Sequence, residues 1–177
     1  MENDFSLILN NGEEILKTYK PNKLKCYISS IIALIWLYVS LITFFLLSFL
    51  VPDENGEKMP LVAFVICMSL VVVFLIFHLI FTNMAFKKRV YCVTNQRLVI
   101  KCGVIGVDYK SLDLKYIGAV DVYVSFLDKI IRKNTGTLRF GSMSSPMNSG
   151  AMFIFSSIYS PYEMYKEIKQ IIEENRN

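Results

Sequence analysis

Residues 26–51 read CYISSIIALIWLYVSLITFFLLSFLV, and residues 61–82 read LVAFVICMSLVVVFLIFHLIFT. Neither run contains a Lys, Arg, Asp or Glu. At a helical rise of about 1.5 Å per residue the runs would extend roughly 39 Å and roughly 33 Å, and the hydrocarbon core of a bilayer is about 30 Å thick. We therefore predict two transmembrane helices, the first of which tilts or projects from the bilayer.

The loop between the runs, PDENGEKMP at residues 52–60, is short and rich in turn-forming residues. It makes the two spans antiparallel neighbours, so residues 26–86 are predicted to form a transmembrane hairpin. A hydrophobic content of 54% and a mean hydropathy of +0.43 exceed what is usual for a soluble domain. A cleaved signal peptide is not expected, because a turn-rich segment follows the first run where a cleavage site would need small residues.

Basic residues beside the spans predict the orientation of the hairpin, since Lys and Arg near a span resist translocation. The loop between the spans offers only Lys58. The outer flanks hold seven basic residues: Lys17, Lys20, Lys23, Lys25, Lys87, Lys88 and Arg89. We therefore expect a multi-pass membrane protein with both termini in the cytoplasm. Residues 1–25 would form a cytoplasmic segment in which residues 13–19 could lie along lipid headgroups.

From residue 90 the pattern changes to short β-branched and aromatic stretches broken by polar or glycine turns, which is typical of strands. We expect strands at 90–94, 97–102, 107–112, 118–124, 137–141 and 151–155. With a two-residue turn at 95–96, Cys92 lies opposite Val99, and Cys102 lies on the other face. In a reducing cytoplasm disulfides are not expected.

A C-terminal helix is predicted from Ser160-Pro161-Tyr162-Glu163, which offers an N-cap, a proline at the first helical position and a capping-box glutamate. Its apolar stripe should pack on the sheet. The stripe comprises Met164, Tyr165, Ile168, Ile171 and Ile172. Residues 90–177 are therefore predicted to be a cytoplasmic domain, an antiparallel barrel or sandwich with a helix over one end or face.

The order of these elements, with several local strings, resembles the bacterial pleckstrin-homology (PH)-like membrane proteins. The matching segments are Gly12-Glu13-Glu14, the two-span hairpin, Tyr91 to Leu98 (YCVTNQRL), Gly103, Ile117, the segment from Ser125 to Leu138, and Ile158 to Glu163. The resemblance implies an all-β, seven-stranded PH-like barrel capped by the C-terminal α-helix, on the cytoplasmic face of a bacterial cell membrane. One strand is then missing from the six above, and we expect it within residues 111–150.

The resemblance implies a binding or assembly module and supplies no catalytic residue. PH domains that bind phosphoinositides gather basic residues around the first strand turn, and here that turn supplies only Arg97. The single histidine, His78, lies near the end of the second apolar run, so the cytoplasmic domain cannot hold a Ser-His-Asp or Cys-His site. For His78 itself, packing or interfacial hydrogen bonding is favoured over a proton-linked role.

No spacing of Cys and His predicts a zinc site, and no glycine-rich string predicts a nucleotide. The GxxG at Gly103–Gly106 is interpreted as a hairpin turn. We expect no enzyme activity, no cofactor, no nucleic-acid partner and no identified small-molecule substrate. Candidate contacts with anionic lipid are Lys87, Lys88, Arg89, Lys129, Arg132 and Lys133. For the loop at 129–133 the alternative is an ordinary solvated loop whose isoleucines, Ile130 and Ile131, enter the core.

The function predicted from the sequence is a non-enzymatic, membrane-anchored PH-like binding or assembly module. Its expected partners are membrane lipids together with a second copy of the chain or another membrane protein. The alternative is an auxiliary subunit of a transporter or envelope-stress system, in which the hairpin itself is the functional part.

Overall fold

The structure, a computed structural model, describes residues 5, 8–52, 56–131, 134–142 and 153–175. They belong to two compact units. The helical unit comprises residues 27–84, and the β unit comprises residues 1–26 together with 85–177. The β unit is therefore assembled from chain segments on both sides of the helical one.

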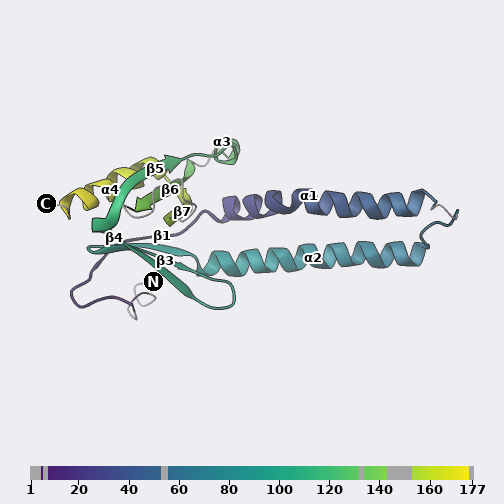
Figure 1. Cartoon of the computed structure of the whole chain (residues 1–177), viewed down its shortest axis with the longest axis horizontal. Coiled ribbons are helices and arrows are strands. Elements are labelled where there is room, and N and C mark those ends of the chain that lie inside the picture. The colour runs from purple at the N-terminus through teal and green to yellow at the C-terminus, as the bar shows by residue number, and fades with distance from the viewer. Residues whose placement is uncertain (1–4, 6–7, 53–55, 132–133, 143–152, 176–177) are drawn as a thin grey trace. The chain divides into compact units, whose positions relative to one another are not determined.

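Helices α1 (Lys23–Leu50) and α2 (Leu61–Lys88) form an antiparallel hairpin (Figure 1). Their most apolar 18-residue windows have mean hydropathies of 2.5 and 3.0, and almost none of the residues in those windows are buried. A core helix of a soluble protein would be largely covered, whereas these two expose apolar side chains such as Trp36 and Phe74. The predicted hairpin is confirmed, and both helices are candidate membrane spans by length and composition.

Two antiparallel sheets make up most of the β unit. The first has the order β1-β2-β3-β4 and the second the order β5-β6-β7. The strands are β1 (Ile15–Tyr19), β2 (Val90–Thr94), β3 (Arg97–Cys102), β4 (Asp108–Asp113), β5 (Ile117–Tyr123), β6 (Thr135–Ser142) and β7 (Phe153–Tyr159). The six predicted strands are all present, β2 and β3 with the predicted limits. Cys92 pairs with Val99, as the two-residue turn requires.

The seventh strand lies before the hairpin, so its expected position within 111–150 is wrong. It is β1, which pairs antiparallel with β2 and places Tyr19 opposite Tyr91. The apolar hairpin therefore takes the place of a turn between two neighbouring strands. Residues 1–25, predicted as a separate segment, instead belong to the β unit. The reason is that β1 gains its backbone partners from β2, 72 positions further on for the pair Tyr19 and Tyr91 and 79 for the pair Ile15 and Thr94.

The main core lies between the two sheets. Tyr91 and Leu98 from the first sheet meet Phe140 and Phe155 from the second, and the rings of Tyr91 and Phe155 stack at 4.6 Å. The described residues contain no strand pairing that joins the two sheets, so they form a sandwich-like pair of sheets and not a closed barrel. Phe5 covers the other face of β2 and β3, where Val90, Cys92 and Val99 are buried.

Helix α4 (Pro161–Glu174) packs on β5 and β6, and Met164, Ile168 and Ile172 of the predicted stripe are buried. The predicted capping box is absent. Ser160 has left-handed backbone angles and makes no side-chain cap bond; its backbone N–H instead donates to the Asn134 carbonyl. A short helix, α3 (Phe126–Ile131), lies between β5 and β6 where a loop was expected, and its Ile130 is exposed instead of entering the core.

Candidate functional site

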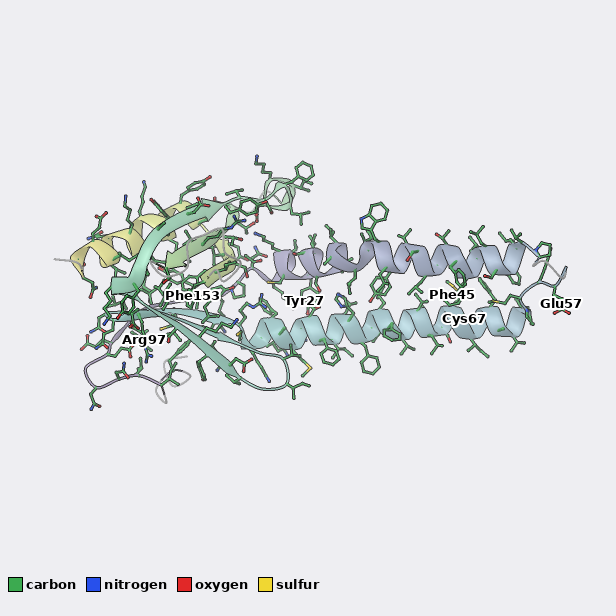
Figure 2. The ribbon with its side chains drawn as sticks, in the orientation of Figure 1. Tyr27, Phe45, Glu57, Cys67, Arg97 and Phe153 are labelled. Carbon is green, nitrogen blue, oxygen red and sulfur yellow. The ribbon has the colours of Figure 1, made fainter. Side chains whose placement is uncertain are left out.

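The string at 91–98 meets Gly12-Glu13-Glu14 in a hydrogen-bonded cluster whose centre, Glu13 and Thr94, is buried. Arg97 (Figure 2) donates from Nε and Nη2 to the two carboxylate oxygens of Glu13, each at 2.9 Å. Thr94 Oγ1 donates to the same carboxylate at 2.7 Å. Asn95 donates its backbone N–H to the Glu14 carbonyl and accepts the Glu14 N–H at its side-chain oxygen. The polar residues that make this string recognisable therefore join the segment before the hairpin to the β2–β3 turn.

The electrostatics of this cluster fit a permanent ion pair. Burial of Glu13 acts to raise its pKa, but hydrogen bonds from Arg97, Asn10 and Thr94 outweigh burial and hold the pKa below its usual value. The Arg97 guanidinium also donates to the Ile8 carbonyl. Arg97, the one basic residue of the turn, is thus committed inside the protein, and the cluster has a structural role.

The N-terminal end of α1 is fixed by a second buried ion pair. Lys25 Nζ lies 2.5 Å from Asp128 Oδ1 on α3, and their side chains are 8% and 0% exposed. Asp128 also accepts hydrogen bonds from Ser125 and Thr135. Although burial acts to raise the pKa of Asp128, the hydrogen bonds from Lys25, Thr135 and Ser125 hold it below its usual value. Asn22 caps α1, because its Oδ1 accepts from the Lys25 backbone N–H at 3.0 Å.

A bulge in β7 contacts the chain just before α1. The pairing of β6 with β7 shifts register between Gly136 and Leu138, and Ser157 has a positive φ of 57°. Its carbonyl accepts the backbone N–H of Asn22, while the Ser156 carbonyl accepts the Tyr91 hydroxyl. Bulges commonly re-aim backbone groups in this way. Here the bulge directs the Ser157 carbonyl toward the Asn22 backbone N–H, just before α1 begins.

The C-terminal end of α2 is fixed by Lys88. Its ammonium donates to the carbonyls of Val104, Ile105 and Gly106 at 2.7, 2.8 and 3.2 Å. These residues form the turn between β3 and β4, so the GxxG is a hairpin turn as predicted. Gly103 adopts a φ of 126°, and a Cβ there would lie 2.5 Å from the Gly106 carbonyl oxygen. The turn presents carbonyls to a cation, the opposite of what a phosphate needs.

The candidate lipid contacts are placed unequally. Lys87 and Lys129 are exposed, and Arg89 is half-buried. Lys88 is engaged by the β3–β4 turn. Arg132 and Lys133 lie outside the described residues. Contact between these basic residues and lipid stays a prediction. Lys87 and Lys129 are the best placed to make that contact, because they are exposed.

The helical unit contains its own polar cluster. His78 Nε2 and Thr82 Oγ1 each lie 2.8 Å from Ser30 Oγ, so His78 makes an interhelical hydrogen bond, as the packing interpretation expects. An apolar groove of about 590 Å³ lies beside it, lined by residues of both helices that include Phe45 and Cys67 (Figure 2). A smaller, more polar pocket of about 320 Å³ in the β unit is lined by Asn95, Arg97 and Lys115 among others.

Groups for catalysis are sparse in the part of the chain that the structure describes. No three His, Cys, Asp or Glu side chains gather there as a metal site would require. Burial, with a smaller effect of the Glu13 charge, raises the pKa of the Cys92 thiol to about 11. This thiol therefore stays protonated near neutral pH and is a poor nucleophile.

Residues 24–171 match the family described as Bacterial PH domain. The chain belongs to the bacterial PH domain family. The match begins at the start of α1 and ends in α4. It therefore includes the apolar hairpin of this bacterial PH domain protein as well as the strands that follow the hairpin. Searches of curated proteins and of solved structures gave no significant match.

The sequence did not predict that Asp128 and Glu13 are the acidic partners of long-range ion pairs. An aspartate in a turn between strands is usually solvated, yet the Asp128 side chain is fully buried. A signal was available in Ser125-Phe126-Leu127-Asp128, since a Ser and an Asp three positions apart can bond to each other around a helix start. Lys25 as the partner had no local signal, because more than 100 residues separate the two.

Proposed function

We propose that this bacterial PH domain protein is a non-enzymatic binding or assembly module held at the cytoplasmic face of a bacterial membrane. In this proposal the hairpin spans the bilayer with both termini in the cytoplasm, and the β unit offers a binding surface beside the membrane. The partner is a second copy of the chain or another membrane protein. Exposed basic residues, Lys87 and Lys129 foremost, add attraction to anionic lipid headgroups.

The observation that carries this proposal is the insertion of the hairpin between β1 and β2. Only residues 20–22 separate β1 from α1, and only Arg89 separates α2 from β2. Within the β unit, the two lysines beside the hairpin have fixed partners: Lys25 forms a buried ion pair with Asp128, and Lys88 donates to the carbonyls of the partly exposed β3–β4 turn. Connections this short keep a domain near its anchor, whereas a long flexible linker would let it range freely.

Membrane topology is the first test. In a cysteine-free background, single cysteines would replace Asn10 before β1, Lys58 in the loop and Lys166 on α4, three exposed positions. Intact cells would be treated with an impermeant maleimide. We expect labelling at position 58 only, with positions 10 and 166 reacting after lysis. Labelling of position 166 in intact cells would reject the orientation.

The partner is tested by crosslinking in membranes followed by affinity purification under mild detergent. Recovery of a stoichiometric membrane protein, or of crosslinked copies of the chain, supports the module. A solitary monomer at native expression level contradicts it.

The second candidate is an auxiliary subunit of a transporter or envelope-stress system in which the hairpin is functional. The polar cluster of Ser30, His78 and Thr82 beside an apolar groove favours it, because polar groups inside a membrane segment are costly and often functional. Replacing residues 27–84 by an unrelated two-span hairpin separates the two candidates. If the cellular function of the protein survives the replacement, the tethered module is favoured. If that function is lost while the β unit stays folded, the hairpin is favoured.

A further inference from the structure

Three large apolar side chains protrude from the β unit at two places. Phe126 and Ile130 on α3 are 76% and 59% exposed, and Ile105 at the β3–β4 turn is 85% exposed. Phe126 and Ile130 are four positions apart and share one face of α3, with Lys129 beside them and also exposed. The other large hydrophobic residues with more than half their surface exposed in the described part of this unit are tyrosines, which carry a polar hydroxyl.

Both places are tied to the ends of the apolar hairpin. Asp128 of α3 holds Lys25, the residue immediately before the first apolar run begins at Cys26. The carbonyls of Val104, Ile105 and Gly106 hold Lys88, the last residue of α2. Each protruding segment therefore makes a direct polar contact with a lysine at the end of a candidate span.

We infer that α3 and the β3–β4 turn insert Ile105, Phe126 and Ile130 into the headgroup–acyl boundary of the bilayer that the hairpin spans. Side chains of this kind, with a lysine at the polar edge, are typical of segments that lie in a membrane interface. Lys129 and Lys87 would remain at the headgroups while the apolar side chains enter. The inference rests on the proposed membrane position of the hairpin and adds a second, hydrophobic contact that holds the β unit on the lipid surface.

The bilayer fits these tips better than a protein partner does. A protein interface buries a continuous patch of about 800 Å² on each partner. The two tips are separate loops held by two different lysines, and a bilayer reaches every tip near the hairpin ends at once. Insertion also accounts for the absence of a polar end on all three side chains, because that boundary accepts them without hydrogen bonds.

The test uses the full chain reconstituted into liposomes of phosphatidylethanolamine and phosphatidylglycerol. An environment-sensitive fluorophore is placed on single cysteines at 105, 126 and 130 after the four native cysteines are replaced by alanine. Tyr162, an exposed residue of α4, is the matched control, and Phe74 on α2 reports the hairpin. Quenching is compared for a shallow lipid-bound nitroxide, a deep lipid-bound nitroxide and aqueous iodide, with thermal unfolding confirming that each labelled protein is folded.

We expect several-fold stronger shallow-nitroxide quenching and several-fold weaker iodide quenching at 105, 126 and 130 than at 162. The deep nitroxide should quench position 74. If 74 is quenched and the three tip positions behave like 162, insertion is rejected while the membrane hairpin stands. If 74 is not quenched, the proposed function itself fails. Protection of the tips from iodide and from both nitroxides would mean that protein covers them, which also overturns the inference.

Discussion

The β unit and the helical unit use polar groups in different ways. In the β unit, buried pairs connect residues far apart in the chain, such as Glu13 with Arg97 and Lys25 with Asp128. In the helical unit, the bonds among Ser30, His78 and Thr82 connect two helices that a short loop already holds together. The hairpin is therefore specified locally by its apolar runs, whereas the β unit depends on segments from both sides of the hairpin.

The strongest test is to separate those segments. A chain that begins at residue 90 lacks β1, which leaves the β2 edge unpaired, and lacks Phe5 and Glu13. We expect it to aggregate or to show no cooperative unfolding. Residues 1–20 joined by an Asn-Gly turn to residues 89–177, with Asp128→Leu because Lys25 is absent, should instead be soluble and folded, since β1 and β2 are antiparallel neighbours. Circular dichroism melts and two-dimensional amide NMR spectra compare the two; equal folding of both would remove β1 from the required structure.

Acidification should weaken both long-range ion pairs together. The pKa values of Glu13 and Asp128 lie below their ordinary values of 4.5 and 3.8 in the folded protein. The unfolded chain therefore binds more protons, so the free energy of unfolding falls as the pH drops below about 5 and keeps falling through the folded pKa values. Urea midpoints of the detergent-solubilised protein measure this. A flat profile between about pH 6 and about pH 3, where ordinary carboxyl groups titrate, would contradict it.

Asp128→Asn isolates the pair at the start of α1. It leaves the Lys25 ammonium buried without its counter-charge, and we expect the free energy of unfolding to fall by about 3–5 kcal/mol. Asp121→Asn, an exposed aspartate of β5, is the matched control and should have little effect. Lys25→Met combined with Asp128→Leu should recover most of the loss. If Asp128→Asn lowered the thermal unfolding midpoint no more than Asp121→Asn does, the buried pair would make no contribution to stability.

Glu13→Gln should have a smaller effect, about 1–3 kcal/mol, since a neutral amide leaves Arg97 incompletely satisfied while that side chain retains some access to water. Glu14→Gln changes the exposed neighbour and should leave stability unaltered. Hydrogen exchange at the amides of Asn95 and Gln96 is the sharper measurement. Faster exchange in Glu13→Gln alone supports the cluster as the join between β1 and the β2–β3 turn.

Ser30→Ala in the helical unit should have the smallest effect, about 0.6 kcal/mol, the average of hydrogen bonds between membrane helices. Ser40→Ala is its control, because Ser40 bonds to a carbonyl of its own helix at Leu37. Unfolding in mixed bicelles with increasing dodecyl sulfate gives the difference. A loss comparable to that of Asp128→Asn would overturn the contrast between the two units and would favour the hairpin as the functional part.

The sequence by itself determined the features that depend on neighbouring residues. Uncharged apolar runs predicted α1 and α2, and alternation with turn residues predicted six strands. Helical spacing predicted the buried face of α4. Ser160 shows the limit of such rules, because its residue type suits a cap but its left-handed backbone directs the side chain elsewhere.

Only the tertiary structure decided that Ile15–Tyr19 is the missing strand and that Glu13, Lys25, Lys88 and Asp128 hold the segments beside the hairpin. The physical reason is distance along the chain. A five-residue strand gains its hydrogen bonds from a partner that folding brings beside it, and a buried charge is stable only where its counter-charge arrives. Neither partner can be read from the residues next to it.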